Sequence, residues 1–276
     1  MNLLFIRSTW TKTNSQDFRV RLVFLLGKSP SLAAQVQIER ENNEFNDIVQ
    51  GDFVDSYRNL SYKSIMANTW VSLFCQQAEF VLKADDDMFV DMYELFVFTR
   101  QFLKTNPYIN SSFLVCPVAQ GGSPNRDPNT KWYVSYEDLS KSENGTNDVV
   151  YPPYCSGNIH LTNLGTAAKL VRAAESSKPL PIEDVWVTGY LAQKLGIQHF
   201  DIWDLHSLSD SVLLLQKIKQ NTEEYTKDFL CGLINRDFEL SLALTKKAEW
   251  CYNVKCNNSF YYPTSLKKPF FYLIVF

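Results

Sequence analysis

Residues 80–90 read Phe-Val-Leu-Lys-Ala-Asp-Asp-Asp-Met-Phe-Val and place three consecutive carboxylates directly after an apolar run. The run predicts a buried strand over 80–84 that ends in concentrated negative charge. Side chains alternate along an extended backbone, so Asp85 and Asp87 can point to the same side. Two carboxylates held this close repel each other unless a cation lies between them. Hard oxygen ligands suit Mg²⁺ or Mn²⁺, which makes the triplet a candidate metal–diphosphate site.

The composition narrows the class of protein. The chain has 276 residues, of which 45% are hydrophobic, enough for one large domain or two small ones. Its net charge of -3 and the scatter of Lys and Arg give no long-range reason to bind nucleic acid. No apolar run approaches the ~20 residues that a membrane helix needs. The apolar opening, Met1 to Ile6, is also too short for a signal peptide of ~15–30 residues.

Cysteines and glycosylation signals favour a secretory or lumenal protein. The six cysteines stand at positions 75, 116, 155, 231, 251 and 256. Six cysteines allow 15 pairings, and the sequence does not choose among them, although Cys251 and Cys256 are close enough for a local bridge. No C-x-x-C pair occurs, which argues against a structural zinc site. Four N-glycosylation signals begin at Asn59, Asn110, Asn144 and Asn257.

Strand and helix patterns alternate through the first hundred residues. Apolar runs predict strands at 21–26, 47–50 and 80–84. Helical patterns lie at 31–41, 55–74 and after Asp91, and Ser31 and Asp91 are the expected caps of the first and last of these helices. This alternation predicts an α/β fold with a largely parallel sheet. Ligands in such sheets bind beyond the carboxyl ends of strands, which is where the aspartate triplet falls.

The second half of the chain is less regular. Residues 121–149 are rich in Gly, Asn, Ser and Pro and predict a long loop, with a short hairpin around residues 132–134. Thr162 is expected to cap the next helix, and Gly196 is expected to end a helix that begins near Glu183. Residues after Ser207 have a weaker, helical and charged pattern.

Two further segments carry reactive side chains. Residues 181–189 read Pro-Ile-Glu-Asp-Val-Trp-Val-Thr-Gly and put Glu183 and Asp184 in the first turn of a helix. Helix capping alone explains such a carboxylate pair, because acids are favoured at helix N-termini. Residues 151–157 read Tyr-Pro-Pro-Tyr-Cys-Ser-Gly, and loop packing alone explains this aromatic turn.

Taken together and in order, these segments resemble the β-1,3-galactosyltransferase family, which includes β-1,3-N-acetylglucosaminyltransferases and is related to the fringe proteins. The matching segments are 6–10 (I-R-x-T-W), 24–27 (F-L-L-G), 41–64 (around D-I-V-Q), 83–90 (K-x-D-D-D-x-F-V), 151–157 (Y-P-x-Y-C-x-G) and 183–189 (E-D-V-x-x-G). The resemblance covers roughly residues 6 to 200. Each motif is weak by itself, but six in order are specific.

The resemblance implies a GT-A fold, a single domain with a mixed, mostly parallel central sheet flanked by helices. Residues 1–207 would form the catalytic domain and residues 208–276 a helical C-terminal extension. The family places its enzymes in the Golgi lumen on a type II membrane anchor. Its I-R-x-T-W segment also follows an apolar strand. Only five residues precede Ile6 here, so we expect anchor, stem and first strand to be missing.

The resemblance also implies the reaction and its metal. An inverting, metal-dependent enzyme would transfer galactose or an N-acetylhexosamine from a UDP-sugar to a glycan hydroxyl, forming a β-1,3 linkage. Asp87 would bind Mn²⁺ or Mg²⁺, and a histidine downstream of the E-D-V segment would add a ligand. His206 is the candidate and His199 the alternative. A satisfied structural histidine remains an equal explanation for each.

The remaining roles fall on the other carboxylates and two lysines. Asp85 and Asp86 would face the ribose and help to set the metal, and Asp184 would take the proton from the acceptor hydroxyl. Glu183 would orient or cap. Lys83 and Lys63 would neutralise either phosphate or a buried acid, and a structural ion pair is an equal explanation for each.

Three other functions are weighed against this one. The nucleophile of haloacid-dehalogenase-like phosphatases expects Thr or Val where Phe89 stands. A Ca²⁺-binding loop would have more widely spaced ligands and a Gly turn. A catalytically weak lumenal protein that binds glycans or acts as a scaffold, with a decayed nucleotide site, is the alternative from a different class.

Overall fold

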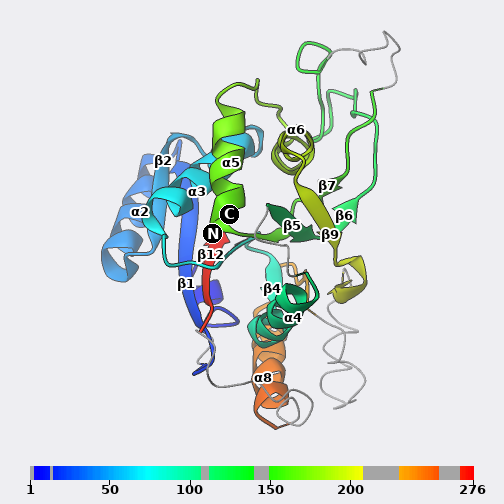
Figure 1. The fold of residues 1–276 in the computed structure, drawn as a ribbon. Coiled ribbons are helices and arrows are strands. Elements are labelled where there is room, and N and C mark those ends of the chain that lie inside the picture. The colour runs from blue at the N-terminus through cyan, green and yellow to red at the C-terminus, as the bar shows by residue number, and fades with distance from the viewer. Residues whose placement is uncertain (1–2, 13–14, 107–111, 140–148, 208–229, 255–267) are drawn as a thin grey trace.

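The computed structural model describes residues 3–12, 15–106, 112–139, 149–207, 230–254 and 268–276. The strands of the central sheet are β1 (Arg19–Lys28), β2 (Ile48–Val54), β3 (Phe80–Ala84), β5 (Phe113–Cys116), β8 (Ile159–Thr162), β9 (Gln198–Asp201) and β12 (Phe270–Val275). Their order across the sheet is β2-β1-β12-β3-β8-β5-β9 (Figure 1).

The sheet is mixed and mostly parallel. Strands β2, β1, β12 and β3 run parallel to one another, and β5 runs parallel to β9. Strand β8 is antiparallel to both of its neighbours, β3 and β5. With helices on its faces, this arrangement confirms the expected fold class and is consistent with a GT-A-like domain.

Alternate residues of the strands face two separate cores. In β1, Phe24 and Leu26 join one hydrophobic cluster, whereas Val23 and Leu25 join another. The first cluster is covered by α1 (Leu3–Arg7), α4 (Met92–Thr105) and α8 (Phe238–Val254). The second is covered by α3 (Leu60–Phe74) and α5 (Leu164–Ala174). Because both faces are buried, the central strands are continuous apolar runs.

The last strand in sequence occupies the middle of the sheet. Strand β12 pairs in parallel with β1 on one side and with β3 on the other, and Leu273 lies opposite both Leu22 and Leu82. Phe271 and Leu273 are fully buried. The apolar run of β12 therefore fills the position between β1 and β3.

The described part of residues 208–276, expected to be a helical extension, contains strands as well as a helix. Residues 208–229 and 255–267 lie outside the described ranges. Helix α8 is helical as expected, but β11 (Cys231–Leu233) and β12 are strands that pair with strands of the first 207 residues. The apolar character of residues 270–276 explains the strand, because both faces of the sheet are buried there.

Two smaller sheets flank the central one. Strands β10 (His206–Ser207), β11 and β4 (Met88–Val90) lie in this order, with β11 antiparallel to β4. Strands β6 (Val118–Ala119) and β7 (Tyr154–Cys155) form an antiparallel pair. The first of these sheets brings the segment after residue 230 to the strand that follows the aspartate triplet.

Helix starts follow local capping chemistry. Ser31 caps α2 (Leu32–Phe45), and Asp91 caps α4, both as expected. The expected cap Thr162 is wrong for α5, because the side chain of Asn163 accepts the hydrogen bond from the backbone N–H of Thr166. Thr162 instead ends β8, where its hydroxyl donates to the carbonyl oxygen of Phe113 at 2.7 Å.

Three other segments differ from the expected elements. The helix after residue 55 begins as a short 3-10 turn, η1 (Tyr57–Asn59), before α3. The helix at 183–195 is a π-helix, η2 (Val185–Leu191), followed by α6 (Ala192–Leu195). The described part of the long loop contains an isolated bridge between Asn125 and Tyr133 rather than a hairpin.

Within the described ranges, no helix has both the length and the apolar character needed to cross a membrane.

Candidate functional site

The aspartate triplet forms the turn that joins β3 to β4, as the apolar run before it predicts. The backbone N–H of Asp85 donates to the carbonyl oxygen of Asn158 at 2.9 Å, and the N–H of Met88 closes the turn on the carbonyl oxygen of Asp85 at 3.2 Å. Asp86 is buried, and Asp85 and Asp87 are partly buried. Backbone hydrogen bonds therefore fix all three carboxylates at the carboxyl end of a central strand.

Asp87 carries the signature of a cation ligand. Its Oδ1 atom is buried and has no hydrogen-bond partner among the described residues. Burial raises the pKa of Asp87, and the charges of Asp85 and Asp86 raise it further. An unpartnered carboxylate beside two like charges is costly unless a cation neutralises it, and three carboxylates suit Mg²⁺ or Mn²⁺. The described ranges hold no complete group of three or more His, Cys, Asp or Glu side chains placed for a metal, so the ligand set stays a prediction.

Lys83 connects the triplet to a loop on the other side of the site. Its Nζ atom lies 2.5 Å from Oδ1 of Asp85 and also donates to the carbonyl oxygen of Gly157. Burial opposes the charge on Lys83, but the carboxylates of Asp85 and Glu183 outweigh it and raise the pKa of Lys83. Lys83 thus forms a buried ion pair with Asp85 and holds it next to Gly157.

Lys63 has a similar structural partner farther away. Its Nζ atom lies 2.8 Å from Asp55, and the same carboxylate accepts a hydrogen bond from the backbone N–H of Gly27. Because Asp55 is partly exposed, the geometry supports the structural ion pair among the explanations open for Lys63.

Asp184 lies at the start of η2 and lines a cavity. Its side chain accepts a hydrogen bond from the backbone N–H of Val185 at 2.8 Å, so the capping explanation is correct. The same side chain also lines a cavity of ≈ 310 Å³. The other lining residues are mainly polar or aromatic: Ser123, Asn125, Trp132, Tyr151, Tyr154, Ile182 and Val185. Burial raises the pKa of Asp184, which brings this carboxylate closer to the range of a general base.

Gly157 lies between the aspartate triplet and Asp184. A Cβ atom at this position would lie 3.0 Å from Oδ2 of Asp184, so a side chain would push on that carboxylate. The carbonyl oxygen of the same residue accepts the hydrogen bond from Lys83. Asp85 and Asp184, far apart in sequence, are therefore separated by one residue and one ion pair.

Glu183 points into the protein beside Asp184 rather than into the cavity. It is 7% exposed, and burial raises its pKa to about 7, an effect that Lys83 reduces and Asp184 increases. A buried acid with this pKa is stabilising only while it is protonated.

Glu183→Gln is expected to flatten the dependence of stability on pH. Because the folded-state pKa is about 7 and the ordinary value 4.5, Glu183 contributes stability below pH 4.5 and loses it as pH rises through 7. The loss in the parent protein is up to roughly 3 kcal/mol. Urea unfolding between pH 4.5 and 8 measures it, with Glu137→Gln, an exposed site, as the matched control. Equal slopes for Glu183→Gln and the parent would contradict the assignment.

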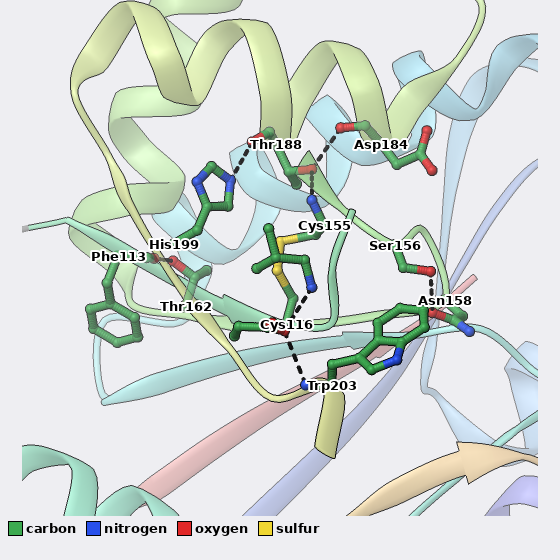
Figure 2. Close-up of a disulfide and its surroundings, with 12 residues drawn as sticks. Phe113, Cys116, Cys155, Ser156, Asn158, Thr162, Asp184, Thr188, His199 and Trp203 are labelled. Atoms are coloured by element: carbon green, nitrogen blue, oxygen red, sulfur yellow. Dashed lines mark hydrogen bonds between the residues drawn. A yellow bond between two sulfur atoms is a disulfide. The ribbon is translucent and has the colours of Figure 1, made fainter. Parts of the chain in front are cut away.

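A disulfide and one threonine hold the loop against η2. Cys116 at the end of β5 is bonded to Cys155 in β7. Figure 2 shows Thr188 between Cys155 and Asp184, where its hydroxyl accepts from the N–H of Cys155 at 2.9 Å and donates to the carbonyl oxygen of Asp184 at 2.6 Å. The sequence leaves this pairing open, and Cys256 of the suggested local bridge lies outside the described residues.

Cys155→Ala is expected to lower the free energy of unfolding by about 2–4 kcal/mol, because the disulfide restricts the unfolded chain. Guanidinium unfolding measures the loss. Treating the parent protein with a reducing agent should reproduce it, and the same treatment of Cys155→Ala should have no further effect. A reduced parent protein as stable as the oxidised one would contradict the pairing with Cys116.

The two candidate histidines occupy different environments. His199 Nε2 lies 2.7 Å from the carbonyl oxygen of Thr188, which commits that nitrogen to η2. His206 Nε2 lies 3.5 Å from Nδ2 of Asn158. The backbone carbonyl oxygen of Asn158 accepts a hydrogen bond from the N–H of Asp85, the first residue of the triplet. Burial lowers the pKa of both rings and favours the neutral form that can bind a metal. His206 is thus the better placed of the two, and its role as a metal ligand stays a prediction.

Sequence reasoning missed one charged residue beside the triplet. The guanidinium of Arg236 donates to both carboxylate oxygens of Asp86, at 3.0 and 2.6 Å. Both residues line a cavity of ≈ 440 Å³ with Leu4, Phe5, Ile6, Ser8 and Phe238. No motif marks Arg236, and only the pairing of β11 with β4 brings it to the site.

Comparison with known proteins identifies the family. A family model described as Galactosyltransferase matches residues 4–202. Beta-1,3-galactosyltransferase 1 of Mus musculus and of Homo sapiens are each 35% identical over 196 residues, which is 71% of this chain and 56% of the relative. Beta-1,3-galactosyltransferase 5 of Pan paniscus is 35% identical over 203 residues, 73% of this chain and 62% of the relative. The match thus spans little more than half the length of these relatives. Because the family model covers most of the sequence, this chain belongs to the galactosyltransferase family.

Proposed function

We propose that this protein transfers galactose or an N-acetylhexosamine from a UDP-sugar to a glycan hydroxyl, with inversion, to form a β-1,3 linkage. The observation that carries the proposal is that the aspartate triplet and Asp184 approach each other at Gly157. The triplet borders the larger cavity, of ≈ 440 Å³, through Asp86, and Asp184 borders the smaller cavity, of ≈ 310 Å³. Such a pair of cavities offers separate places for a donor and an acceptor on either side of the reacting bond.

The larger cavity has the character that a nucleotide needs. Leu4, Ile6 and Phe238 provide apolar surface for a base, and Asp86 and Arg236 provide charged groups. Small-molecule sites are typically apolar cavities with a few placed polar groups. Asp87, with Asp85, would hold the divalent cation, and a cation there would offset the charge that grows on the departing UDP.

The smaller cavity has the character of an acceptor site. Trp132, Tyr151 and Tyr154 present aromatic surface and hydroxyl groups, and Asp184 is the carboxylate among them. Asp184 would take the proton from the acceptor hydroxyl as that oxygen attacks the sugar. A positioned general base contributes ~10²–10⁴-fold, and a raised pKa suits it to the task near neutral pH. Inversion needs one such base, so Glu183 can remain structural.

The cellular setting that we infer is the Golgi lumen, at its membrane. The bond between Cys116 and Cys155 supports an oxidising compartment, since disulfides persist there and are rare in the cytosol. The four glycosylation signals support the same route.

The direct test of the proposed function is release of UDP. UDP-galactose and UDP-N-acetylglucosamine are supplied in turn with Mn²⁺ and a panel of glycan acceptors, and UDP is quantified. We expect release with one donor that needs both the acceptor and the metal. Glycan binding without UDP release from either donor would support the non-catalytic alternative instead.

A further inference from the structure

Arg236 reaches the candidate donor site through an unusual backbone turn. Asn235 and Arg236 both have positive φ angles, 50° and 61°, which residues other than glycine seldom adopt. The turn is held because the N–H of Ile234 donates to the carbonyl oxygen of Asp87 at 2.9 Å, and the N–H of Asp237 donates to that of Ile234 at 2.9 Å. Strained backbone of this kind persists where the surroundings fix it and often occurs at ligand sites.

The contact with Asp86 leaves part of the guanidinium available. Nε and Nη2 of Arg236 bind Asp86, and Nη1 has no hydrogen-bond partner in the described part of the chain. The Asp86 side chain is 10% exposed and that of Arg236 is 64% exposed. Among the described residues that line the ≈ 440 Å³ cavity, Arg236 is the only cation. Lys83, the other cation at the triplet, is buried and already bound to Asp85 and Gly157.

We propose that Arg236 is a donor-binding residue that contacts the diphosphate of the nucleotide, while its other edge stays on Asp86. This inference rests on the proposed function, because it assigns the occupant of the same cavity. A planar guanidinium with five N–H donors can bind a carboxylate along one edge and a phosphate along another. Arg236 lies outside the family match over 4–202, so the family assignment by itself gives this residue no role.

Affinity for UDP compared with uridine separates a phosphate contact from a structural role. Both ligands are titrated by calorimetry, with Mn²⁺, into the parent protein and Arg236→Gln. We expect UDP to bind ~10- to 100-fold more weakly to the variant, because charge-assisted hydrogen bonds are lost, and uridine to bind equally well. Arg236→Lys keeps the charge without the planar fork and should lie between the two. Arg40→Gln in α2, an exposed site, is the matched control.

A double-mutant cycle separates direct contact from an effect through Asp86. In an Asp86→Asn background, Arg236→Gln should still weaken UDP ~10-fold. Loss of uridine and UDP binding by the same factor, or no further loss in the Asp86→Asn background, would overturn the inference. A parent protein that binds UDP and transfers sugar, with an unchanged UDP affinity in Arg236→Gln, would overturn it while leaving the proposed function intact. A parent protein that does not bind UDP would overturn both.

Discussion

Asp184→Asn is expected to lower kcat by ~10²–10⁴-fold while leaving UDP binding in Mn²⁺ unchanged. The amide oxygen of Asn can still accept the hydrogen bond from the N–H of Val185, so η2 keeps its cap. The amide cannot, however, take a proton from an acceptor hydroxyl. Steady-state kinetics and calorimetric titration of UDP measure the two effects separately.

Two further variants bound this prediction. Asp87→Ala should lose both transfer and Mn²⁺-dependent UDP binding, because its buried Oδ1, which has no hydrogen-bond partner among the described residues, is the proposed cation ligand. Asp127→Asn changes an exposed carboxylate that does not line the smaller cavity, and it should leave sugar transfer and UDP binding intact. Transfer by Asp184→Asn at the parent rate would show that another group is the base.

Leu273→Asp is expected to abolish cooperative folding. Leu273 is fully buried in the strand between β1 and β3 and belongs to the larger hydrophobic cluster. Truncating such a leucine to alanine costs ~2–5 kcal/mol, of a total stability of ~5–15 kcal/mol for a typical domain. An unpaired carboxylate there costs more, because it loses its hydration. Circular dichroism during thermal unfolding measures the result.

The control for this variant lies in the same segment. Lys268→Asp changes an exposed residue two positions before β12 and should unfold at the parent temperature. If Leu273→Asp also unfolded at the parent temperature, β12 would not occupy the centre of the sheet. The variant thus tests whether the end of the sequence supports the strand that carries the aspartate triplet.

Local chemistry accounts for the parts of the fold that the sequence predicts. The run before the triplet forms β3 because both of its faces are buried, and Ser31 and Asp91 cap helices because their side chains accept backbone N–H groups. These features depend on a few neighbouring residues, which a sequence pattern records directly.

Features that depend on distant pairing are not visible in the sequence. The place of β12 is set by its partners β1 and β3, and the pairing of Cys116 with Cys155 by the approach of β5 to β7. Arg236 meets Asp86 only because β11 pairs with β4. Even the misassigned cap of α5 has this origin, because Thr162 serves the sheet through the carbonyl oxygen of Phe113.

The linkage of the product tests the central claim most directly. The donor that releases UDP is incubated with Mn²⁺ and its glycan acceptor, and the anomeric configuration and linkage position of the product are determined by NMR. Attack by a hydroxyl activated at Asp184 with inversion predicts a β-linked hexose, and the family assignment predicts position 3 of the acceptor. An α-linked product, or free sugar without transfer, would contradict the account.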